Sequence, residues 1–340
     1  MKTKIERRKG NKRRIILIGD GAVGSSFAFA SVLKGTGREL GIMDVNKNKA
    51  YGDVLDLEDA LVYSEPKHIF VADYEDCKEA DIVIIAAGVP QKDKNQSRLE
   101  LLTENIILFN EIVTKVMASG FNGIFVIASN PVDILSYATW KFSGLPHNKV
   151  IGTGTSLDTA RFRYELSDLV KVDTRNVHIY ILGEHGDSEF PAWSVGNVGG
   201  INFEKWLDLH PEIDKKVLNE IFETVRDKAY KIIENKRATY YGIAASLNRI
   251  VKAILNDENS ILPISTYLNG QYGLEDVYIG TPAILGKHGV VDILELPLNE
   301  KELQKYKESA DKLKEAINAP FKNIKEKDEN NNESTSNKDW

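Results

Sequence analysis

The 340-residue chain has a single cysteine, Cys77, so no disulfide bond can form within it. Its cysteine and histidine residues never stand at the spacing of zinc ligands, and we expect no metal site. No apolar run approaches the roughly 20 residues that span a bilayer, and the N-terminus lacks the apolar core of a secretory signal. The sequence therefore predicts a cytoplasmic protein, not bound to a membrane, whose fold depends on packing alone.

The overall charge is small, and only the two ends depart from an ordinary composition. A net charge of −6 at pH 7 gives no general attraction to nucleic acid or to acidic membranes. Residues 1–14 carry eight Lys or Arg residues against one acid, which fits a frayed, solvated terminus or, alternatively, a phosphate-binding arm. Residues 322–340 are polar and rich in asparagine. We expect 1–12 to be a disordered basic tail and 322–340 a disordered polar tail.

The first half of the chain alternates short apolar strands with helical segments. The strand Ile15 to Ile18 ends in glycine, and a helical stretch from Ala22 to Lys34 follows it directly. Such alternation is typical of an α/β fold with a parallel, doubly wound sheet of the Rossmann type. We assign it to a first domain over residues 13–150, with further strands at 40–43, 69–72, 82–86 and 124–128 and helices near 48–61 and 98–119.

After about residue 150 the pattern changes. Helical segments are expected near 156–170, 211–235, 242–255 and 299–317, with strands at 177–182 and between 260 and 294. This order no longer alternates strand with helix. The sequence therefore predicts a second domain of mixed α+β type over residues 151–321.

A glycine-rich turn joins the first strand to the first helix. Its sequence, Gly19-Asp20-Gly21-Ala22-Val23-Gly24, has the spacing that lets a backbone approach a pyrophosphate at a helix N-terminus. Asp44 follows Gly24 by 20 residues, at the end of the second strand, where a carboxylate can accept hydrogen bonds from ribose hydroxyls. A carboxylate there would repel a 2′-phosphate. The turn could be an ordinary glycine turn, but with Asp44 it predicts binding of NAD rather than NADP.

Three further segments carry side chains suited to acid–base chemistry. His185 is flanked by glycines just after an apolar strand, where an imidazole can act as a proton donor. Asp158 and Arg161 stand three residues apart on one helical face. Arg98 lies in a polar, lysine-rich loop. Taken singly, these residues could equally be an ordinary surface histidine, a helix ion pair and a solvated loop charge.

Together the motifs resemble those of the lactate/malate dehydrogenase family, over nearly the whole chain from Arg13 to Phe321. The matching segments are the glycine turn at 19–24, Ser97-Arg98-Leu99, Ser129-Asn130-Pro131-Val132-Asp133, Leu157-Asp158-Thr159-Ala160-Arg161-Phe162, Gly183-Glu184-His185-Gly186-Asp187 and Ala238-Thr239-Tyr240-Tyr241-Gly242. The resemblance implies a hydride transfer between NAD and carbon 2 of a small L-2-hydroxy acid. A protein that keeps the dinucleotide fold without turnover is the alternative from another class.

The resemblance also implies a role for each catalytic residue. Arg161 would hold the substrate carboxylate through two parallel hydrogen bonds. His185 would exchange a proton with the substrate oxygen, and Asp158 would orient the imidazole and stabilise its charged form. Arg98, on a loop that closes over the substrate, would polarise the carbonyl. The expected substrate-binding residues are Arg161, Gln91, Asn130 and Thr239, and the expected cofactor-binding residues are Gly19, Gly21, Ala22, Val23, Gly24, Asp44 and Asn130.

Two positions depart from the family pattern. Substrate choice in the family depends on a residue six before the mobile arginine, glutamine in lactate enzymes and arginine in malate enzymes. Here Gln91 lies seven before Arg98, and Lys92 lies six before it. Gln91 favours reduction of pyruvate to L-lactate, whereas Lys92 leaves a malate dehydrogenase, or another L-2-hydroxy acid dehydrogenase, open. Arg237 stands where the family normally has glycine.

The resemblance also extends to assembly and regulation. Arg163 and His178 match positions that bind fructose 1,6-bisphosphate between two subunits in many bacterial members of the family. Arg163 and Arg161 point to different faces of their helix, since they are two residues apart. We therefore expect an allosterically regulated homotetramer with a role in glycolytic fermentation. Alternatively, Arg163 could be an ordinary surface charge and His178 an ordinary strand residue.

Overall fold

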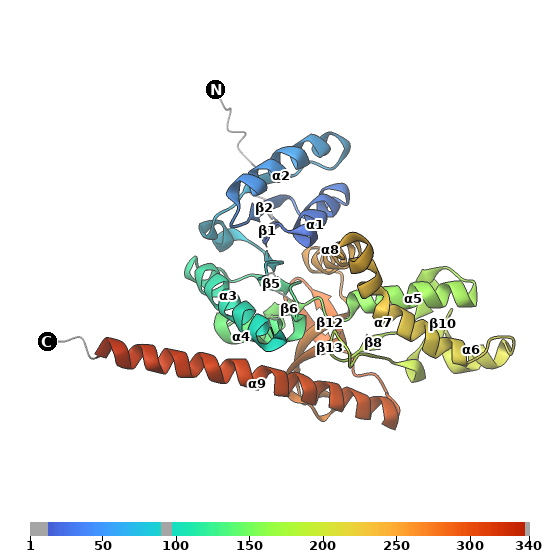
Figure 1. Cartoon of the computed structure of the whole chain (residues 1–340). Helices are drawn as coiled ribbons and strands as arrows, with labels where there is room; N and C mark the ends of the chain where they lie inside the picture. The colour runs from blue at the N-terminus through green and yellow to red at the C-terminus, as the bar shows by residue number, and fades with distance from the viewer. Residues whose placement is uncertain (1–12, 90–96, 337–340) are drawn as a thin grey trace.

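The computed structural model describes residues 13–89 and 97–336, apart from the side chains of Arg98 and of residues 319–336. The residues expected to form the basic tail, 1–12, and the substrate loop residues Gln91 and Lys92 lie outside this part of the chain. The described residues form a central sheet flanked by helices on both faces, with a smaller lobe beside it (Figure 1).

The first half of the chain forms the parallel sheet that the alternation predicts. Five of its strands pair in the order β5-β4-β1-β2-β3, and β6 extends the row beyond β5. The strands and helices, in chain order, are β1 (Arg14–Ile18), α1 (Ala22–Leu33), β2 (Glu39–Met43), α2 (Lys47–Ala60), β3 (His68–Val71), β4 (Ile82–Ile85), α3 (Arg98–Ala118), β5 (Ile124–Ile127), α4 (Val132–Ser143) and β6 (Val150–Gly152). The Rossmann-type fold expected from the sequence is thus confirmed.

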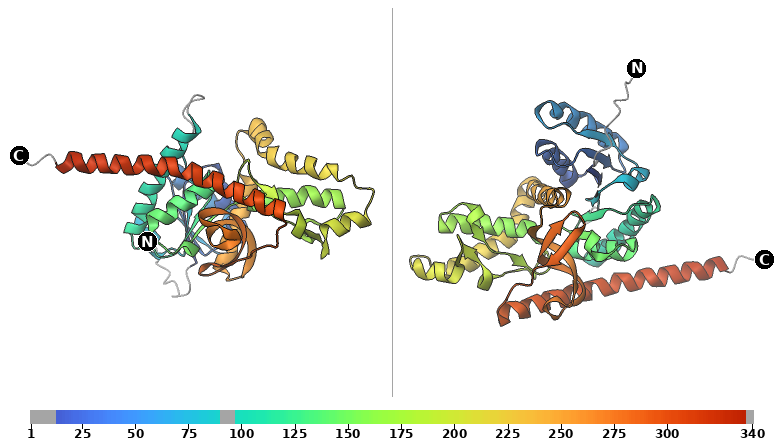
Figure 2. Two further views of the ribbon diagram at one scale, coloured as in Figure 1. Left: turned by 90° about the horizontal axis from the view of Figure 1, so that it is seen from below. Right: turned by 180° about the vertical axis from the view of Figure 1, so that it is seen from behind.

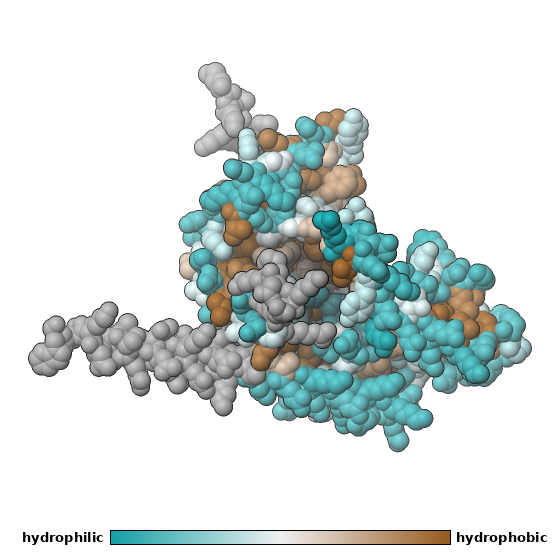
Figure 3. All heavy atoms as spheres, viewed as in Figure 1, coloured by the Kyte–Doolittle hydropathy of each residue, from teal (hydrophilic) through white to brown (hydrophobic). Residues whose placement is uncertain are grey.

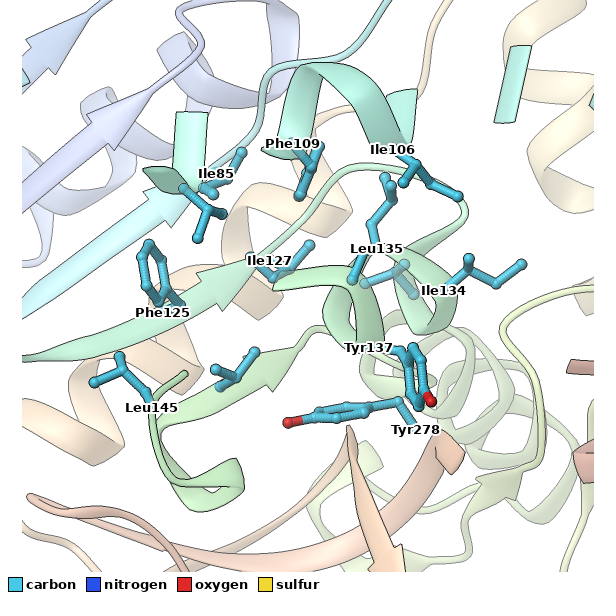
Figure 4. Packing of buried hydrophobic residues seen from close by; sticks show 14 of the residues in the cluster. Ile85, Ile106, Phe109, Phe125, Ile127, Ile134, Leu135, Tyr137, Leu145 and Tyr278 are labelled. Carbon is cyan, nitrogen blue, oxygen red and sulfur yellow. The ribbon is translucent and has the colours of Figure 1, made fainter. Parts of the chain in front are cut away.

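The central strands are apolar on both faces because helices cover both sides of the sheet. Along β4 and β5, successive side chains alternate between two buried clusters, one under α3 and α4 and the other under α1, α2 and α8 (Tyr241–Leu255). Ile85, Phe125 and Ile127 pack with Phe109 of α3 and Leu135 of α4 on the first face (Figure 4). This core fixes the strand ends from which the candidate site residues project.

The second half of the chain extends the same sheet instead of forming a separate one. The strands expected between 260 and 294 are β12 (Ser260–Asn269), β13 (Glu275–Gly286) and β14 (Gly289–Ile293). β12 pairs antiparallel with β6, and β13 and β14 follow it, each antiparallel to its neighbour. The contact is close, because a Cβ on Gly152 would lie 2.7 Å from the Cβ of Ser265. The open edge of β6 therefore explains the single nine-stranded mixed sheet.

The lobe beside the sheet contains α5 (Ser156–Val170), α6 (Phe203–Leu209) and α7 (Lys216–Lys236), and α8 (Tyr241–Leu255) packs back against α1. The helix expected at 211–235 begins later, at Lys216. The strand expected at 177–182 is two short strands, β7 (Val177–His178) and β8 (Ile181–Leu182), which pair in different small sheets. These sheets are completed by β9 (Phe190–Pro191), β10 (Asn197–Val198) and β11 (Ile201–Asn202).

The last helix corrects the expected C-terminal tail. α9 covers Glu300–Ser336, whereas the sequence predicted a helix that ends near 317 and a disordered segment from 322. No glycine or proline follows Pro320, and residues 322–327 include three lysines and one glutamate, which are good helix formers, so the helix can continue beyond residue 317. α9 extends well past the side of the sheet (Figure 2).

The face of the molecule in Figure 3 is mostly hydrophilic, with small apolar patches scattered over it. No helix within the described residues is long and apolar enough to cross a membrane.

Candidate active site

The three glycines of the turn after β1 have distinct structural roles. Gly19 has a φ of +99°, and a Cβ there would lie 2.4 Å from the backbone nitrogen of Ala87. A Cβ on Gly24 would lie 2.0 Å from the carbonyl oxygen of Gly19, so only glycine allows α1 to pack against the turn. A Cβ on Gly21 would meet nothing within 4 Å, and no side chain caps the helix at Gly21. This open backbone at the helix N-terminus fits the pyrophosphate of a dinucleotide.

Asp44 lies beside this turn, directly after β2. Its Oδ2 accepts a hydrogen bond from the backbone nitrogen of Asp20 at 2.8 Å, and its Oδ1 accepts one from Asn46 at 2.9 Å. Each carboxylate oxygen has a second lone pair for a ribose hydroxyl. The residues present at this edge of the sheet therefore fit NAD.

Sequence reasoning missed a buried acid in the glycine turn and its partner. The side chain of Asp20 is buried and bonds Lys49 Nζ at 2.9 Å, while Lys49 also contacts Asp53 at 2.7 Å. Burial raises the pKa of Asp20 to about 6, although Lys49 opposes the effect. In the sequence Lys49 is one of several lysines on a helix, and no local signal marks it. The pair holds α2 against the turn near Asp44.

The structure brings His185 and Asp158 into direct contact, although they lie 27 residues apart. His185 Nδ1 is 2.6 Å from Asp158 Oδ2, and the backbone nitrogen of His185 donates to Asp133 Oδ2 at 2.8 Å. Gly183, with a φ of +101°, joins the loop to β13 through two backbone hydrogen bonds with Gly280. These contacts fix the imidazole plane and leave Nε2 for a ligand.

The local electrostatics favour the imidazolium form. Burial alone would lower the pKa of His185, but the charge of Asp158 and its hydrogen bond outweigh burial and, with Glu189 and Asp133, raise this pKa to about 9. Burial also opposes ionisation of Asp158, yet His185 and Arg161 hold its pKa below the ordinary value. At neutral pH the pair is therefore a carboxylate bound to an imidazolium.

Arg161 lies on the other side of Asp158. Its NH1 donates to Asp158 Oδ1 at 3.3 Å and its NH2 to Thr239 Oγ1 at 3.4 Å, with only 10% of the side chain exposed. The expected ion pair is thus buried rather than on a helix surface. α5 and the segment before α8 together present a guanidinium and a hydroxyl next to the imidazole.

Glu189 is a second acid at this site that the sequence reasoning missed. Oxygen and nitrogen atoms of Asp158, His185 and Glu189 all lie within 4.8 Å of one another. Burial, followed by the charge of Asp158, raises the pKa of Glu189 to about 9. We assign no metal to this cluster, because Asp158 already binds His185 and Arg161 and a protonated Glu189 is a poor ligand.

Comparison with known proteins agrees with this geometry. Residues 13–152 match the model of the lactate/malate dehydrogenase NAD-binding domain, and residues 155–324 match that of the lactate/malate dehydrogenase alpha/beta C-terminal domain. The chain belongs to the lactate/malate dehydrogenase family. It is therefore an NAD-dependent dehydrogenase, as the resemblance implied.

Individual members of the family are close to this chain over nearly its full length. The L-lactate dehydrogenase of Lacticaseibacillus casei is 54% identical over 91% of this chain and 94% of that protein. L-lactate dehydrogenase 1 of Listeria monocytogenes is 55% identical over 92% and 98%. A solved lactate dehydrogenase from a Medee basin deep-sea metagenome library is 49% identical with a TM-score of 0.89, over 91% and 99%. The ligand-bound minor L-lactate dehydrogenase of Enterococcus mundtii is 46% identical with the same TM-score and coverage.

The remaining residues suggested by the family pattern lie at different places. Asn130 is exposed in the segment that follows β5, two residues beyond the first residue after the strand, at the same sheet edge as the glycine turn. Arg98 is the first residue of α3, which Ser97 caps by accepting a hydrogen bond from Glu100. The side chain of Arg98 and the whole of Gln91 lie outside the described part of the chain, so their approach to the site stays a prediction.

Arg163 lies against the segment that directly follows His178. Arg163 donates through Nε to the carbonyl oxygen of Ile179 at 3.1 Å, and its guanidinium lies 5.2 Å from the centre of the Tyr180 ring. His178 is exposed on the adjacent strand β7. Burial lowers the pKa of Arg163, which is partly covered rather than fully outward.

Proposed function

We propose that this enzyme is an L-lactate dehydrogenase that reversibly reduces pyruvate to L-lactate with NADH. The 2.6 Å contact between His185 and Asp158, with Arg161 beside it, carries the proposal. The similarity of this chain to proteins named L-lactate dehydrogenase also supports it. We assign cofactor binding to residues 13–150, with Gly19, Gly21, Ala22, Val23, Gly24, Asp44 and Asn130, and substrate binding to residues 151–321.

Arg161 binds the pyruvate carboxylate. Its planar guanidinium forms two parallel hydrogen bonds to a carboxylate, which a lysine cannot do, and Thr239 supports it from one side. Asn130, in the segment that follows β5, contributes to the polar wall near the reacting oxygen, and Arg98 polarises the carbonyl. Binding by the carboxylate end orients carbon 2.

His185 supplies the proton. As an imidazolium it donates through Nε2 to the carbonyl oxygen, and in lactate oxidation the neutral ring accepts the hydroxyl proton. Asp158 holds the ring through Nδ1 and stabilises its charge. Bound NADH supplies the hydride for carbon 2. The reaction regenerates NAD, which fits a cytoplasmic role in glycolytic fermentation.

Substrate choice rests on the loop before Arg98. Gln91 favours pyruvate, whereas Lys92 could pair with the second carboxylate of oxaloacetate, so malate dehydrogenase is the second candidate. Purified enzyme is assayed with NADH on each substrate separately, with His185→Gln as the inactive control. A higher kcat/KM on pyruvate supports the proposal, and a higher value on oxaloacetate contradicts it. Loss of NADH oxidation with every 2-keto acid would indicate a binding protein without turnover.

We also propose a homotetramer that fructose 1,6-bisphosphate activates at Arg163 and His178. Phe29, Leu33 and Tyr63 are exposed around one hollow on α1 and the α2 region, which supports assembly. Facing subunits would bring like charges together until a bisphosphate neutralises them.

The test measures the KM for pyruvate with and without the bisphosphate, and the oligomeric state by sedimentation. Arg163→Gln should abolish activation, whereas Arg175→Gln, a change at an arginine whose side chain is 88% exposed, should retain it. An equal effect in both variants, or none in the wild type, contradicts the regulatory proposal.

A further inference from the structure

A pocket of about 300 Å³ lies at the amino edge of the parallel sheet, where neither the cofactor nor the substrate is expected. Its wall is formed by residues that directly precede four strands: Arg13 before β1, Asp81 before β4, Gly123 before β5 and Lys149 before β6. The glycine turn follows the other end of β1, which is five residues long, so the two sites are about 15 Å apart.

Positive charge dominates the wall of this pocket. Arg13, Lys78, Lys149 and Lys287 contribute four cations, and Asp81 contributes the one carboxylate among the lining residues. One oxygen of Asp81 already accepts a hydrogen bond from the backbone nitrogen of Arg14 at 2.8 Å. The pocket therefore has a clear excess of positive charge.

Most of these cations have no acidic partner within the described residues. Lys287 contacts Asp257 at 3.3 Å, but no salt bridge there involves Arg13, Lys78 or Lys149. Lys149 Nζ donates only to the two oxygens of Asn122, at 2.7 and 2.8 Å, and Arg13 donates to the Asn256 amide at 3.1 Å. Three cations thus retain donors for a negatively charged ligand.

The negative end of the α8 dipole offsets only part of this positive charge. Ile254 and Leu255 line the pocket from the last turn of α8, where the helix dipole is equivalent to about half a negative charge. That is far less than four cations. The backbone is also unusual here, because Arg13 has a φ of +45°, a left-handed conformation that non-glycine residues rarely adopt.

We propose that this pocket binds a small multivalent phosphate anion. A concave site surrounded by ammonium and guanidinium groups matches an anion with several charged oxygens, and 300 Å³ has room for a di- or triphosphate. The inference is independent of the proposed activity and of the proposed bisphosphate site at Arg163.

The test is isothermal titration of the full-length protein with inorganic tripolyphosphate at an ionic strength of about 0.1 M, where the Debye length is about 10 Å. Saturating NADH is present, so that the glycine turn is not available to the probe. The test variant is K78Q/K149Q. Its control is K171Q/K215Q, which removes the same charge at two lysines whose side chains are 79% and 69% exposed and which lie outside the pocket. K149R serves as the conservative variant.

The wild type should bind tripolyphosphate, and K78Q/K149Q should bind it at least about 10-fold more weakly, equivalent to about 1.4 kcal/mol. The control should stay within about twofold because long-range charge is screened, and K149R should retain binding. Turnover should be unchanged in all these variants. No binding by the wild type, an equal loss in the control, or loss of binding in Arg163→Gln overturns the proposal.

Discussion

Replacing Asp158 with Asn tests the pairing on which the proposed chemistry depends. The substitution keeps the size of the side chain and one oxygen that can accept from His185 Nδ1, but it removes the negative charge. Burial then acts on the imidazole without that opposing charge. We expect the pKa of His185 to fall to its ordinary value or below it.

The magnitude follows from the contact. Raising the pKa of His185 from the ordinary 6.5 to about 9 corresponds to about 3 kcal/mol in favour of the imidazolium. Pyruvate reduction needs this protonated form, so in the wild type it should persist at neutral pH and decline as the pH rises through about 9. Lactate oxidation needs the neutral ring and should rise over the same range.

In Asp158→Asn, reduction should decline as the pH rises through about 6.5 instead. At pH 7.5 only about a tenth of the enzyme would then be protonated, which alone costs about tenfold in kcat/KM. Poorer orientation of the ring adds to this loss at every pH. Lowering the pH below about 6.5 should therefore restore part of the reduction activity of the variant, whereas it should change the activity of the wild type little.

The assay is the pH dependence of kcat/KM for pyruvate at saturating NADH. Glu189 needs its own control, because loss of the Asp158 charge makes it easier for Glu189 to ionise and to replace that charge in part. The double variant Asp158→Asn/Glu189→Gln should show the lower limit of the His185 pKa. An unchanged apparent pKa in both variants would refute the reasoning.

Three further predictions use the same structure. Arg161→Lys keeps the charge but loses the paired donors, so the KM for pyruvate should rise about 10- to 100-fold in steady-state assays; a wild-type KM would mean that another residue binds the carboxylate. Asp44→Ala should weaken NADH binding by a similar factor and raise the ratio of kcat/KM with NADP to kcat/KM with NAD. A constant ratio would exclude Asp44 as the ribose ligand. Arg237→Gly should stabilise the fold by about 0.5–1 kcal/mol in urea unfolding, because Arg237 follows the end of α7 with a φ of +71°. Lys171→Gly, at the equivalent end of α5, is the matched comparison. Destabilisation by both substitutions would contradict the strain argument.

The parts of the fold that the sequence predicted well are those with local causes. A β-branched run that ends in glycine predicts β1 and its turn, and the buried alternation of β4 and β5 follows from their apolar sequence. The extension of the sheet by β12 could not be predicted this way. It depends on the open edge of β6 and on the absence of a side chain at Gly152, which no local pattern records.

The candidate site shows the same division. The positions of Gly19 and Asp44 follow from spacing within one strand–helix–strand unit, β1 to β2. The contact between His185 and Asp158 joins α5 to a loop 27 residues away, so only the family resemblance suggested it. Glu189 and Lys49 gave no signal at all, because a charged side chain near a glycine or on a helix is usually solvated, and only the folded chain buries or pairs them.

The C-terminal segment shows why disorder and helicity need separate arguments. A polar segment cannot bury enough apolar surface to hold a fixed place in a fold, and that reasoning predicted a disordered tail from residue 322. Helix continuation depends instead on local propensity, and the segment after Pro320 begins with good helix formers and contains neither glycine nor proline, although the asparagines at 330–332 are weaker helix formers. α9 therefore continues to Ser336 without any need for a packed face, since each added residue extends a helix that Tyr306 and Leu313 already anchor in the core.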